Sequence, residues 1–421
     1  MTGSVDIQQA VESIYREDSR RVYATLVRVL GGNFELAEDA MHDAFAVAVD
    51  RWAEEGVPAN PYSWLVSTGR FKAIDAIRRR TRFDTALPEL AYQRDLASSD
   101  EVEIDDETIA DDQLRLIFTC CHPALAPDAR VALTLREVCG LTTEEIARAY
   151  LTAPSTLAQR IVRAKAKIKR DRIPYEVPAP EERPDRLDAV LQVIYLVFNE
   201  GYSASFGPSL TRPDISGEAI RLARLLNALL ADSEAMGLLA LLLLHEARRE
   251  ARTTPDGDLV PLEDQDRTRW DRDLIAEGRA LVDAAIATQR IGPYTLQAAI
   301  AAAHAQAPNS EATDWGRIVA LYDLLGMVAP SPVVELNRAA AVAMRDGPEI
   351  GLTLIDGILD EGKLADYHLA HAARADLLRR LGRVEEARAA YGRALELVPQ
   401  ERERRFLKRR LAELDAPDAN A

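Results

Sequence analysis

The sequence predicts an all-α protein. Apolar residues recur at the i, i+3, i+4, i+7 spacing of amphipathic helices, while alternating runs of β-branched residues are lacking. Ala, Leu and Arg, which favour helices, dominate, and aromatic residues make up only 6% of the 421 residues. With 48% hydrophobic and 29% charged residues, the composition is that of a folded globular protein of several domains.

Five segments follow one another along the chain. A first helical unit is expected at 6–83, an acidic linker at 84–108, and a second helical unit at 109–172. A proline-rich joint at 173–183 interrupts the helices, because proline lacks the backbone N–H donor that a helix needs. A long helical extension is expected to fill 184–415.

The charge of the chain is unevenly distributed. The net charge of −16 opposes indiscriminate binding to nucleic acid, whose phosphates would repel the protein. Basic residues are nevertheless concentrated in two stretches, Arg70–Arg82 and Arg160–Arg172. Taken alone, each stretch is consistent with a solvated helix face or with a nucleic-acid contact. The sequence around the two stretches has to distinguish between these interpretations.

The second unit has the pattern of a helix-turn-helix. Pro127 opens a helix that is expected to end at Gly140, a common C-terminal cap. A second helix begins behind Thr142, which fits a capping box with Glu145. A third helix follows the break that ends at Pro154.

The third helix has two distinct faces. Leu157, Ile161, Ala164 and Ile168, spaced by 4, 3 and 4 residues, predict a buried face. The opposite face is polar and basic, which suits a recognition helix in a major groove, because Arg and Gln read base edges and Lys holds phosphates. An ordinary basic helix packed on a bundle is the alternative. The residues expected at DNA are Ser155, Thr156, Gln159, Arg160, Arg163 and Lys167.

The first unit decides between classes of helix-turn-helix protein. The acidic segment Ala37–Phe45 leads to Trp52, and Trp64-Leu65 precedes a helix with the pattern Ala-Ile-Asp-x-Ile-Arg-Arg. These segments resemble region two of bacterial sigma factors. Leu135-Arg136-Glu137 and Glu144–Ala147 in the helix-turn-helix are similar to region four.

Both regions in this order, with none between them, resemble an extracytoplasmic-function (ECF) RNA polymerase sigma factor, over residues 8–172. The extension resembles that of a subgroup with a tetratricopeptide-like C-terminal domain. Its best segment, 368–399, predicts two helices broken at Leu381-Gly382-Arg383, with small residues where the helices approach. Further helices are expected at Leu187–Phe198, Gly217–Arg252 and Asp271–Gln289.

The resemblance implies core RNA polymerase and promoter DNA as partners. The helix-turn-helix would read the −35 element and the first unit the −10 element, with Phe71, Ile74 and Ile77 turned inward behind a basic stripe. The residues expected at the −10 element are Asn60, where the family captures a flipped base, and Arg70, Lys72, Arg78, Arg79 and Arg82. Those expected at the polymerase are Asp39, His42 and Asp43, with ordinary surface positions as the alternative.

Two segments depart from the family. Gly69-Arg70-Phe71 stands where members often have Ala-Arg-Asn, and Leu151–Pro154 replaces a Gly-Val-Ser-like turn. The acidic linker is either a solvated connection or, as the family implies, a segment that enters the RNA path of the polymerase.

Nothing in the sequence resembles an active site, so the chain is not expected to be an enzyme. Cys120-Cys121-His122 lacks the separated four-ligand pattern of a zinc site. His245-Glu246 is followed by Arg249 where a zinc-protease helix carries its second histidine. No metal and no cofactor are therefore expected.

The sequence thus predicts a cytoplasmic sigma factor that binds core RNA polymerase and directs transcription initiation at specific promoters. The extension is expected to be a regulatory module that meets a protein or a small-molecule regulator. The main alternative is a polymerase-independent helix-turn-helix regulator with a tetratricopeptide-like sensor domain. An interaction scaffold, whose basic helices are only surfaces, is a further alternative.

Overall fold

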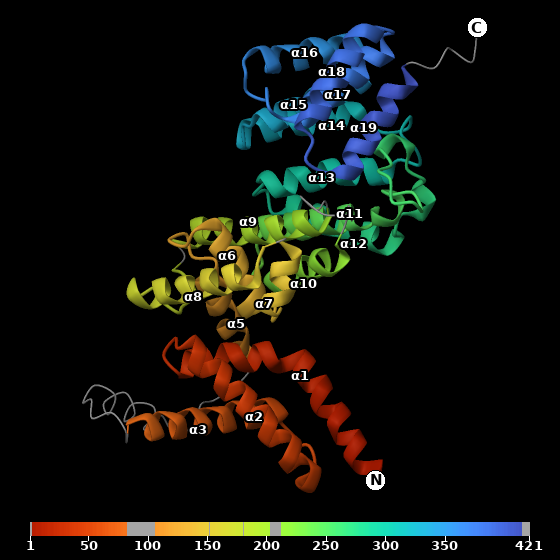
Figure 1. Ribbon diagram of the computed structural model, residues 1–421. Helices are drawn as coiled ribbons and strands as arrows, with labels where there is room; N and C mark the ends of the chain where they lie inside the picture. Colours follow the sequence, from red (N-terminus) through yellow and green to blue (C-terminus); the bar gives the residue numbers. More distant parts are fainter. Residues whose placement is uncertain (1, 82–105, 151, 180, 203–211, 415–421) are drawn as a thin grey trace. The chain divides into compact units, whose positions relative to one another are not determined.

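The computed structural model describes residues 2–81, 106–150, 152–179, 181–202 and 212–414 (Figure 1). Within these ranges every regular element is a helix, and β pairing is confined to one isolated bridge between Thr253 and Leu259. The predicted all-α class is therefore confirmed. The chain forms two compact units, Met1–Val193 (unit 1) and Ile194–Ala421 (unit 2).

Unit 1 begins with three helices that pack on one another: α1 (Thr2–Val29), α2 (Phe34–Glu55) and α3 (Pro61–Thr81). Asn33 starts α2, because its side chain accepts a hydrogen bond from the backbone N–H of Leu36. Trp52 of α2 packs against Trp64 of α3, with ring centroids 5.2 Å apart. These contacts give the three helices a common core.

The rest of unit 1 contains the helix-turn-helix. Its helices are α5 (Asp106–Cys120), α6 (Pro127–Leu133), α7 (Thr143–Ala149), α8 (Pro154–Arg170) and the first part of α9 (Arg183–Tyr202). The helix that begins at Pro127 ends, as predicted, at Gly140, where φ is +79° and glycine carries no steric penalty. Its last turn is a π-helix, η1 (Thr134–Val138), which the sequence pattern did not predict.

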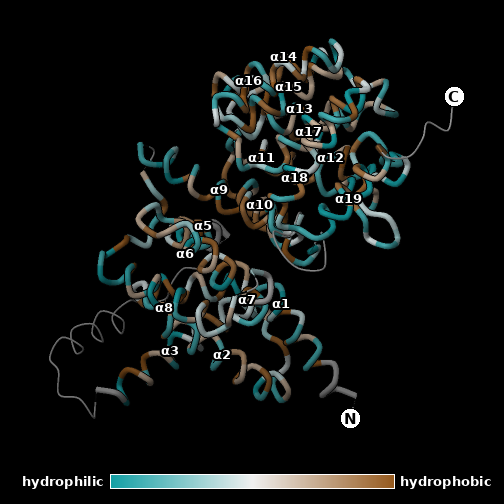
Figure 2. The backbone as a smooth tube through the Cα atoms, turned by 45° about the horizontal axis from the view of Figure 1, so that its top comes forward, coloured by the Kyte–Doolittle hydropathy of each residue, from teal (hydrophilic) through white to brown (hydrophobic). Residues whose placement is uncertain are grey.

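Unit 2 is a succession of helices, most of which pack on their neighbours in sequence, while α13 packs mainly on α11. The hydropathy colouring of Figure 2 alternates along most of them, as expected for amphipathic helices. By contrast, α11 is buried over its whole stretch Gly237–Leu244. The helices of unit 2, besides the end of α9, are α10 (Pro213–Leu229), α11 (Ser233–Glu246), α12 (Arg272–Ala287), α13 (Pro293–Gln306), α14 (Trp315–Val328), α15 (Pro332–Asp346), α16 (Pro348–Asp360), α17 (His368–Arg380), α18 (Val384–Leu397) and α19 (Glu401–Glu413), with short 3₁₀ turns η2 (Arg249–Ala251), η3 (Leu262–Asp264) and η4 (Arg267–Arg269).

Two expectations for the extension can be compared with these helices. The hairpin expected at 368–399 forms α17 and α18, with Gly382 at φ +71° in the turn. The single helix expected over Gly217–Arg252 is wrong. The chain breaks at Leu230–Asp232, because the Asp232 side chain accepts hydrogen bonds from the N–H groups of residues 234 and 235 and starts a new helix.

Candidate nucleic-acid interface

The helix-turn-helix is held by local hydrogen bonds. The backbone N–H of Thr142 donates to Glu145 Oε2 at 2.7 Å, and the N–H of Glu145 donates to Thr142 Oγ1 at 3.2 Å, which is a capping box. In the turn, the N–H of Thr152 donates to the carbonyl of Ala147 at 2.9 Å. Pro154 then starts α8, where its missing N–H costs nothing.

The two faces of α8 differ as the spacing predicts. Leu157, Ile161, Ala164 and Ile168 are its buried residues. Of the six residues predicted to contact DNA, Ser155, Thr156, Gln159 and Arg163 are exposed, and Arg160 and Lys167 are half-buried. Five of them, all but Ser155, border one groove of about 340 Å³ whose other wall is Leu125, Ala126 and Ala129. The structure therefore brings these side chains together on one surface.

Three cations of this face differ in how they are partnered. Arg160 lies 3.8 Å from the Asp128 carboxylate, and Lys167 forms an ion pair with Asp171. Hydrogen bonds from Arg170 and Lys167 lower the pKa of Asp171 to about 2, so this carboxylate is charged at neutral pH. Arg163 is exposed and forms no ion pair within the described part of the chain. Its guanidinium is the cation of this face most available to a base or a phosphate.

The residues predicted to contact the −10 element are spread along α3 and the turn before it. Asn60 is exposed, and its Oδ1 accepts a hydrogen bond from the N–H of Ser63 at 3.0 Å, so it caps α3. Arg70 and Lys72 are half-buried, and Arg78 and Arg79 are exposed. The prediction for Arg82 falls outside the described residues.

Phe71 contradicts the expectation that it turns inward, because 71% of its surface is exposed. The inward position belongs to Gly69, where an added Cβ would lie 3.0 Å from Leu26 Cδ1 and 3.1 Å from the Ala40 carbonyl. A residue two positions further along a helix lies on the opposite side, because each residue turns the helix by about 100°. Phe71 therefore lies on the outer side of α3, between Arg70 and Lys72.

The residues predicted to contact the polymerase lie on α2. Asp39, His42 and Asp43 are all exposed, whereas their neighbours Ala40 and Met41 are buried. The ring of His42 stacks on Tyr15 of α1, with centroids 6.4 Å apart. The three side chains thus form an acidic patch with one histidine on the surface of unit 1.

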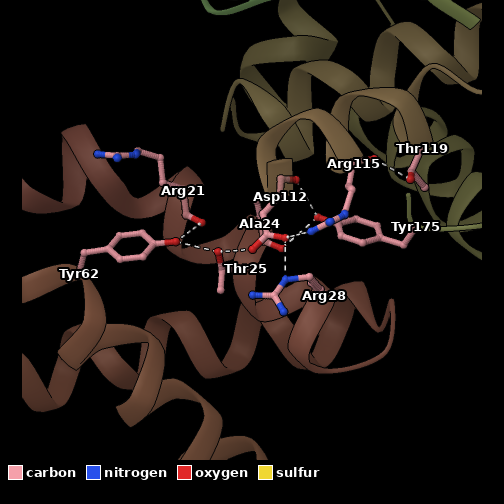
Figure 3. A network of polar contacts seen from close by, with 9 residues as sticks. All are labelled: Arg21, Ala24, Thr25, Arg28, Tyr62, Asp112, Arg115, Thr119 and Tyr175. Atoms are coloured by element: carbon pink, nitrogen blue, oxygen red, sulfur yellow. Dashed lines mark hydrogen bonds and ion pairs between the residues drawn. The ribbon is translucent and has the colours of Figure 1, made fainter. Parts of the chain in front are cut away.

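A buried polar network, which the sequence did not reveal, joins α1 and α3 to α5 (Figure 3). The Asp112 side chain of α5 is fully buried and accepts hydrogen bonds from Arg28 Nε at 2.6 Å and Thr25 Oγ1 at 2.7 Å. Arg115 of α5 donates to the same carboxylate at 2.6 Å. Tyr62 of α3 hydrogen bonds to Thr25 at 2.7 Å, which links the third helix. We call these five residues the Asp112 network.

A second buried carboxylate joins α1 and α2 to the helix-turn-helix. The side chain of Glu137, in η1, is 1% exposed; it accepts a hydrogen bond from Tyr23 and pairs with Lys165 Nζ at 2.8 Å. Glu38 of α2 forms an ion pair with Arg136 and lies 3.9 Å from Lys165. We call these residues the Glu137 network.

Burial fixes the protonation of the phenols in these networks. It raises the pKa of Tyr23 well above its usual value, an effect that Glu137 strengthens, and it raises the pKa of Tyr62 to about 12. Both phenols therefore stay protonated and act as donors. The joint after α8 adds a similar contact, since Tyr175 donates to the Ala24 carbonyl at 2.9 Å. Within unit 1, buried side chains thus connect the first three helices to the helix-turn-helix.

Among the described residues, no helix combines the length and apolar character needed to cross a membrane. The same residues contain no group of three or more His, Cys, Asp or Glu side chains placed to bind a metal ion.

Three segments of the chain match known family models. Residues 14–83 match the family model Sigma-70 region 2, and residues 115–168 match Sigma-70, region 4. Residues 186–286 match a family of unknown function, DUF6596.

Two relatives extend these matches. The chain is 45% identical to the uncharacterized protein R00370 of Rhizobium meliloti (strain 1021) over 391 residues, which is 92% of each protein. It is 29% identical over 171 residues to the ECF RNA polymerase sigma factor SigE of Mycolicibacterium smegmatis, covering 40% of this chain and 63% of that one. No solved structure matches.

Proposed function

Because the chain belongs, with R00370, to a family of ECF-like sigma factors that carry an extra C-terminal domain, we propose that it binds core RNA polymerase and directs initiation at promoters with −35 and −10 elements. The observation that carries the proposal is the outer face of α8, where exposed Thr156, Gln159 and Arg163 follow one another behind a capped helix and a turn. An exposed face of this composition fits a major groove.

At the −35 element, Arg163 and Gln159 are the proposed readers of base edges. Both are exposed, and both side chains make paired hydrogen bonds to purines. Lys167 and Arg160 are proposed to hold phosphates. Their pairs with Asp171 and Asp128 are at the surface and are worth little, so phosphates can replace them.

At the −10 element, the outer side of α3 is the proposed platform for the opened strand. Arg78 and Arg79 supply charge for the backbone, and exposed Phe71 supplies a ring on which an unpaired base stacks. Asn60 caps α3 with its oxygen, and its amide N–H groups remain donors for a flipped base.

The proposed activity requires unit 1 to open. Positions −35 and −10 are about 25 base pairs apart, which is about 85 Å along B-DNA. A compact unit of the length of unit 1 has a radius of gyration of about 16 Å and thus a diameter of about 40 Å. Because the Asp112 and Glu137 networks connect the two DNA-reading parts, we propose that these networks break when both elements are bound.

The remaining parts of the proposal concern partners. Asp39, His42 and Asp43 form an exposed patch that is free to meet basic helices of the polymerase. Unit 2 is proposed to regulate sigma activity by binding a protein or a small molecule. A protein that acts with the polymerase on the chromosome works in the bacterial cytoplasm.

The decisive experiment adds the purified full-length chain to sigma-free core polymerase on a library of genomic DNA fragments and sequences the 5′ ends of the transcripts. We expect start sites that share a pair of upstream motifs and that are missing with core polymerase alone. Arg163→Ala should lower this output about tenfold, because one base contact contributes about 1–3 kcal/mol. Lys169→Ala is the matched control, since Lys169 is exposed on α8 but off the DNA face, and should change it less than about twofold.

Two further arms separate the alternatives. Tight binding of the chain alone to duplex DNA, with no specific initiation, would identify a polymerase-independent regulator instead. A chain that ends at Tyr202, checked for cooperative unfolding, is then compared with the full chain in the same transcription assay. Equal output from the two would show that unit 2 does not regulate initiation.

A further inference from the structure

Unit 2 contains a cavity of about 420 Å³ between helices α11, α13, α14 and α15. Its size lies in the range of about 300–1,000 Å³ that is usual for small-molecule sites. Much of its wall is apolar, including Leu244, Ile300 and Leu325, and three aromatic side chains, Tyr195, Trp270 and Tyr322, complete that wall. An apolar cavity with a few polar groups is the usual form of a ligand site.

The charge of the cavity wall has one sign. None of the lining residues is Asp or Glu, and Arg248 is the lining residue with a permanent charge. Within the described part of the chain, Arg248 forms no ion pair, whereas the next residue, Arg249, pairs with Glu246 and Glu250. The Arg248 guanidinium lies 5.7 Å from the centre of the Tyr202 ring, a contact that leaves its charge uncompensated.

Two histidines share this wall and are neutral. Arg248 donates to His245 Nδ1 at 2.9 Å, since a guanidinium has no acceptor, and the proton of His245 is therefore on Nε2. Burial, and next to it Arg248, lower the pKa of His245 well below its usual value and that of His304 to about 4. At neutral pH the wall thus offers N–H donors and one positive charge.

Other polar atoms of the wall lack partners. Trp270 is 4% exposed, and within the residues that the structure describes neither its Nε1 nor His304 Nδ1 has a hydrogen-bond partner. A buried polar atom without a partner costs about 1–3 kcal/mol.

We propose that this cavity is a binding site for a small organic anion, a carboxylate with an apolar ring body, whose carboxylate pairs with Arg248. The body contacts the aliphatic and aromatic wall, where each buried apolar surface contributes to affinity. The carboxylate takes the place of the missing counter-charge, because a guanidinium binds a carboxylate with two parallel hydrogen bonds. The charge of Arg248 repels a cationic ligand, and a neutral ligand cannot form the ion pair.

The test uses three probes with one body and different charges: 1-naphthoate, 1-naphthalenemethanol and 1-naphthylmethylammonium. Each is titrated calorimetrically into the full-length chain without polymerase or DNA, so the outcome does not depend on sigma activity. We expect 1-naphthoate to bind at least about tenfold more tightly than the alcohol, and the ammonium probe more weakly than both.

Variants connect the preference to the cavity. Arg248→Met keeps an unbranched apolar stem and removes the charge, so it should weaken 1-naphthoate about tenfold. Unchanged binding of the alcohol would show that the cavity is still folded. Arg249→Met, next to it and outside the cavity wall, should change neither. Ala301→Leu narrows the cavity and should weaken both.

Three results would overturn the proposal: no heat of binding with 1-naphthoate at millimolar concentration, equal affinity for the acid and the alcohol, or equal effects of Arg248→Met and Arg249→Met. The first would mean that the cavity takes no ligand of this class. The second and third would mean an apolar cavity without an anion site.

Discussion

A fully buried charge of unit 1 and a half-buried charge of unit 2 have opposite surroundings. In unit 1 the fully buried Asp112 meets two guanidinium groups and a hydroxyl, all within 2.7 Å. In unit 2 the cavity contains Arg248, which meets a neutral histidine and no carboxylate in the described chain. The charge of Asp112 is thus compensated within the chain, whereas that of Arg248 has no counter-charge among the described residues.

This difference separates structural charges from binding charges. Removing a charge from water is costly, so a fully buried charge needs hydrogen bonds or a counter-charge in the same fold. A charge that lacks one in the fold gains most when a ligand supplies it. We therefore expect the loss of Asp112 to destabilise unit 1, whereas Arg248 is suited to a ligand.

The largest expected effect is on the stability of unit 1 and comes from removing the Asp112 carboxylate. Asp112→Ala leaves Arg28 and Arg115 without their shared carboxylate and should lower the free energy of unfolding of unit 1 by about 3–5 kcal/mol. The four tryptophans report the two units separately: Trp52 and Trp64 lie in unit 1, Trp270 and Trp315 in unit 2. Urea titration followed by ¹⁹F NMR of 5-fluorotryptophan-labelled chain measures both in one sample.

Asp75→Ala is the control for this prediction. Asp75 is 63% exposed and lies 3.9 Å from Arg78, so its loss should cost less than about 0.5 kcal/mol. Equal shifts in the signals of Trp52 and Trp64 for both variants would show that the Asp112 network contributes no stability. A shift in the unit 2 signals would show that the effect is not local.

The sequence reveals local features of the site and misses the distant ones. The buried face of α8 follows from the spacing of Leu157, Ile161, Ala164 and Ile168, because helical periodicity is a local property. Thr25 and Asp112 are 87 residues apart, and no local pattern indicates that they meet. The cavity residues are similarly dispersed, from Tyr195 to Asn337, so their shared wall appears only in the fold.

The error at Phe71 has a different cause. Its aromatic side chain suggests burial, but the backbone position decides, and the close approach of α3 to α1 and α2 occurs at Gly69. A glycine within a predicted helix, two residues from an aromatic residue, was the available signal.

The second prediction concerns how the stability of unit 2 depends on pH. His304 has a folded pKa of about 4 against a usual 6.5, through burial and the charges of Arg248 and Arg267. The unfolded chain therefore binds more protons than the folded one between these values, and stability is lost as pH falls from 6.5 towards 4. At about 1.4 kcal/mol per pH unit, unit 2 should lose about 2 kcal/mol between pH 6.5 and pH 5. His245 acts in the same direction.

The ¹⁹F signals of Trp270 and Trp315 measure this loss in urea titrations at the two pH values. His304→Gln should reduce the difference between them, because a glutamine does not titrate. His371→Gln is the control and should leave the difference as it is; His371 is a half-buried residue of α17 whose Nε2 contacts the Ala365 carbonyl. A pH dependence unaffected by His304→Gln would show that this histidine is not the group responsible.

The smallest effect concerns an unpartnered feature of unit 1, the exposed ring of Phe71. If an exposed, unpartnered ring serves a ligand, Phe71→Ala should change the free energy of unfolding of unit 1 by less than about 0.5 kcal/mol and still impair promoter opening. Stacking on an aromatic ring contributes about 1–3 kcal/mol per base, so open complexes should fall at least about fivefold. Permanganate reactivity of unpaired thymines measures them, and Phe71→Trp should restore them. Met327→Ala removes a side chain of unit 2 that is 72% exposed and should have no effect on either quantity. Normal promoter opening by Phe71→Ala would mean that an exposed apolar side chain in this chain does not by itself mark a binding surface. The distinction between partnered and unpartnered groups would then apply to charged side chains alone.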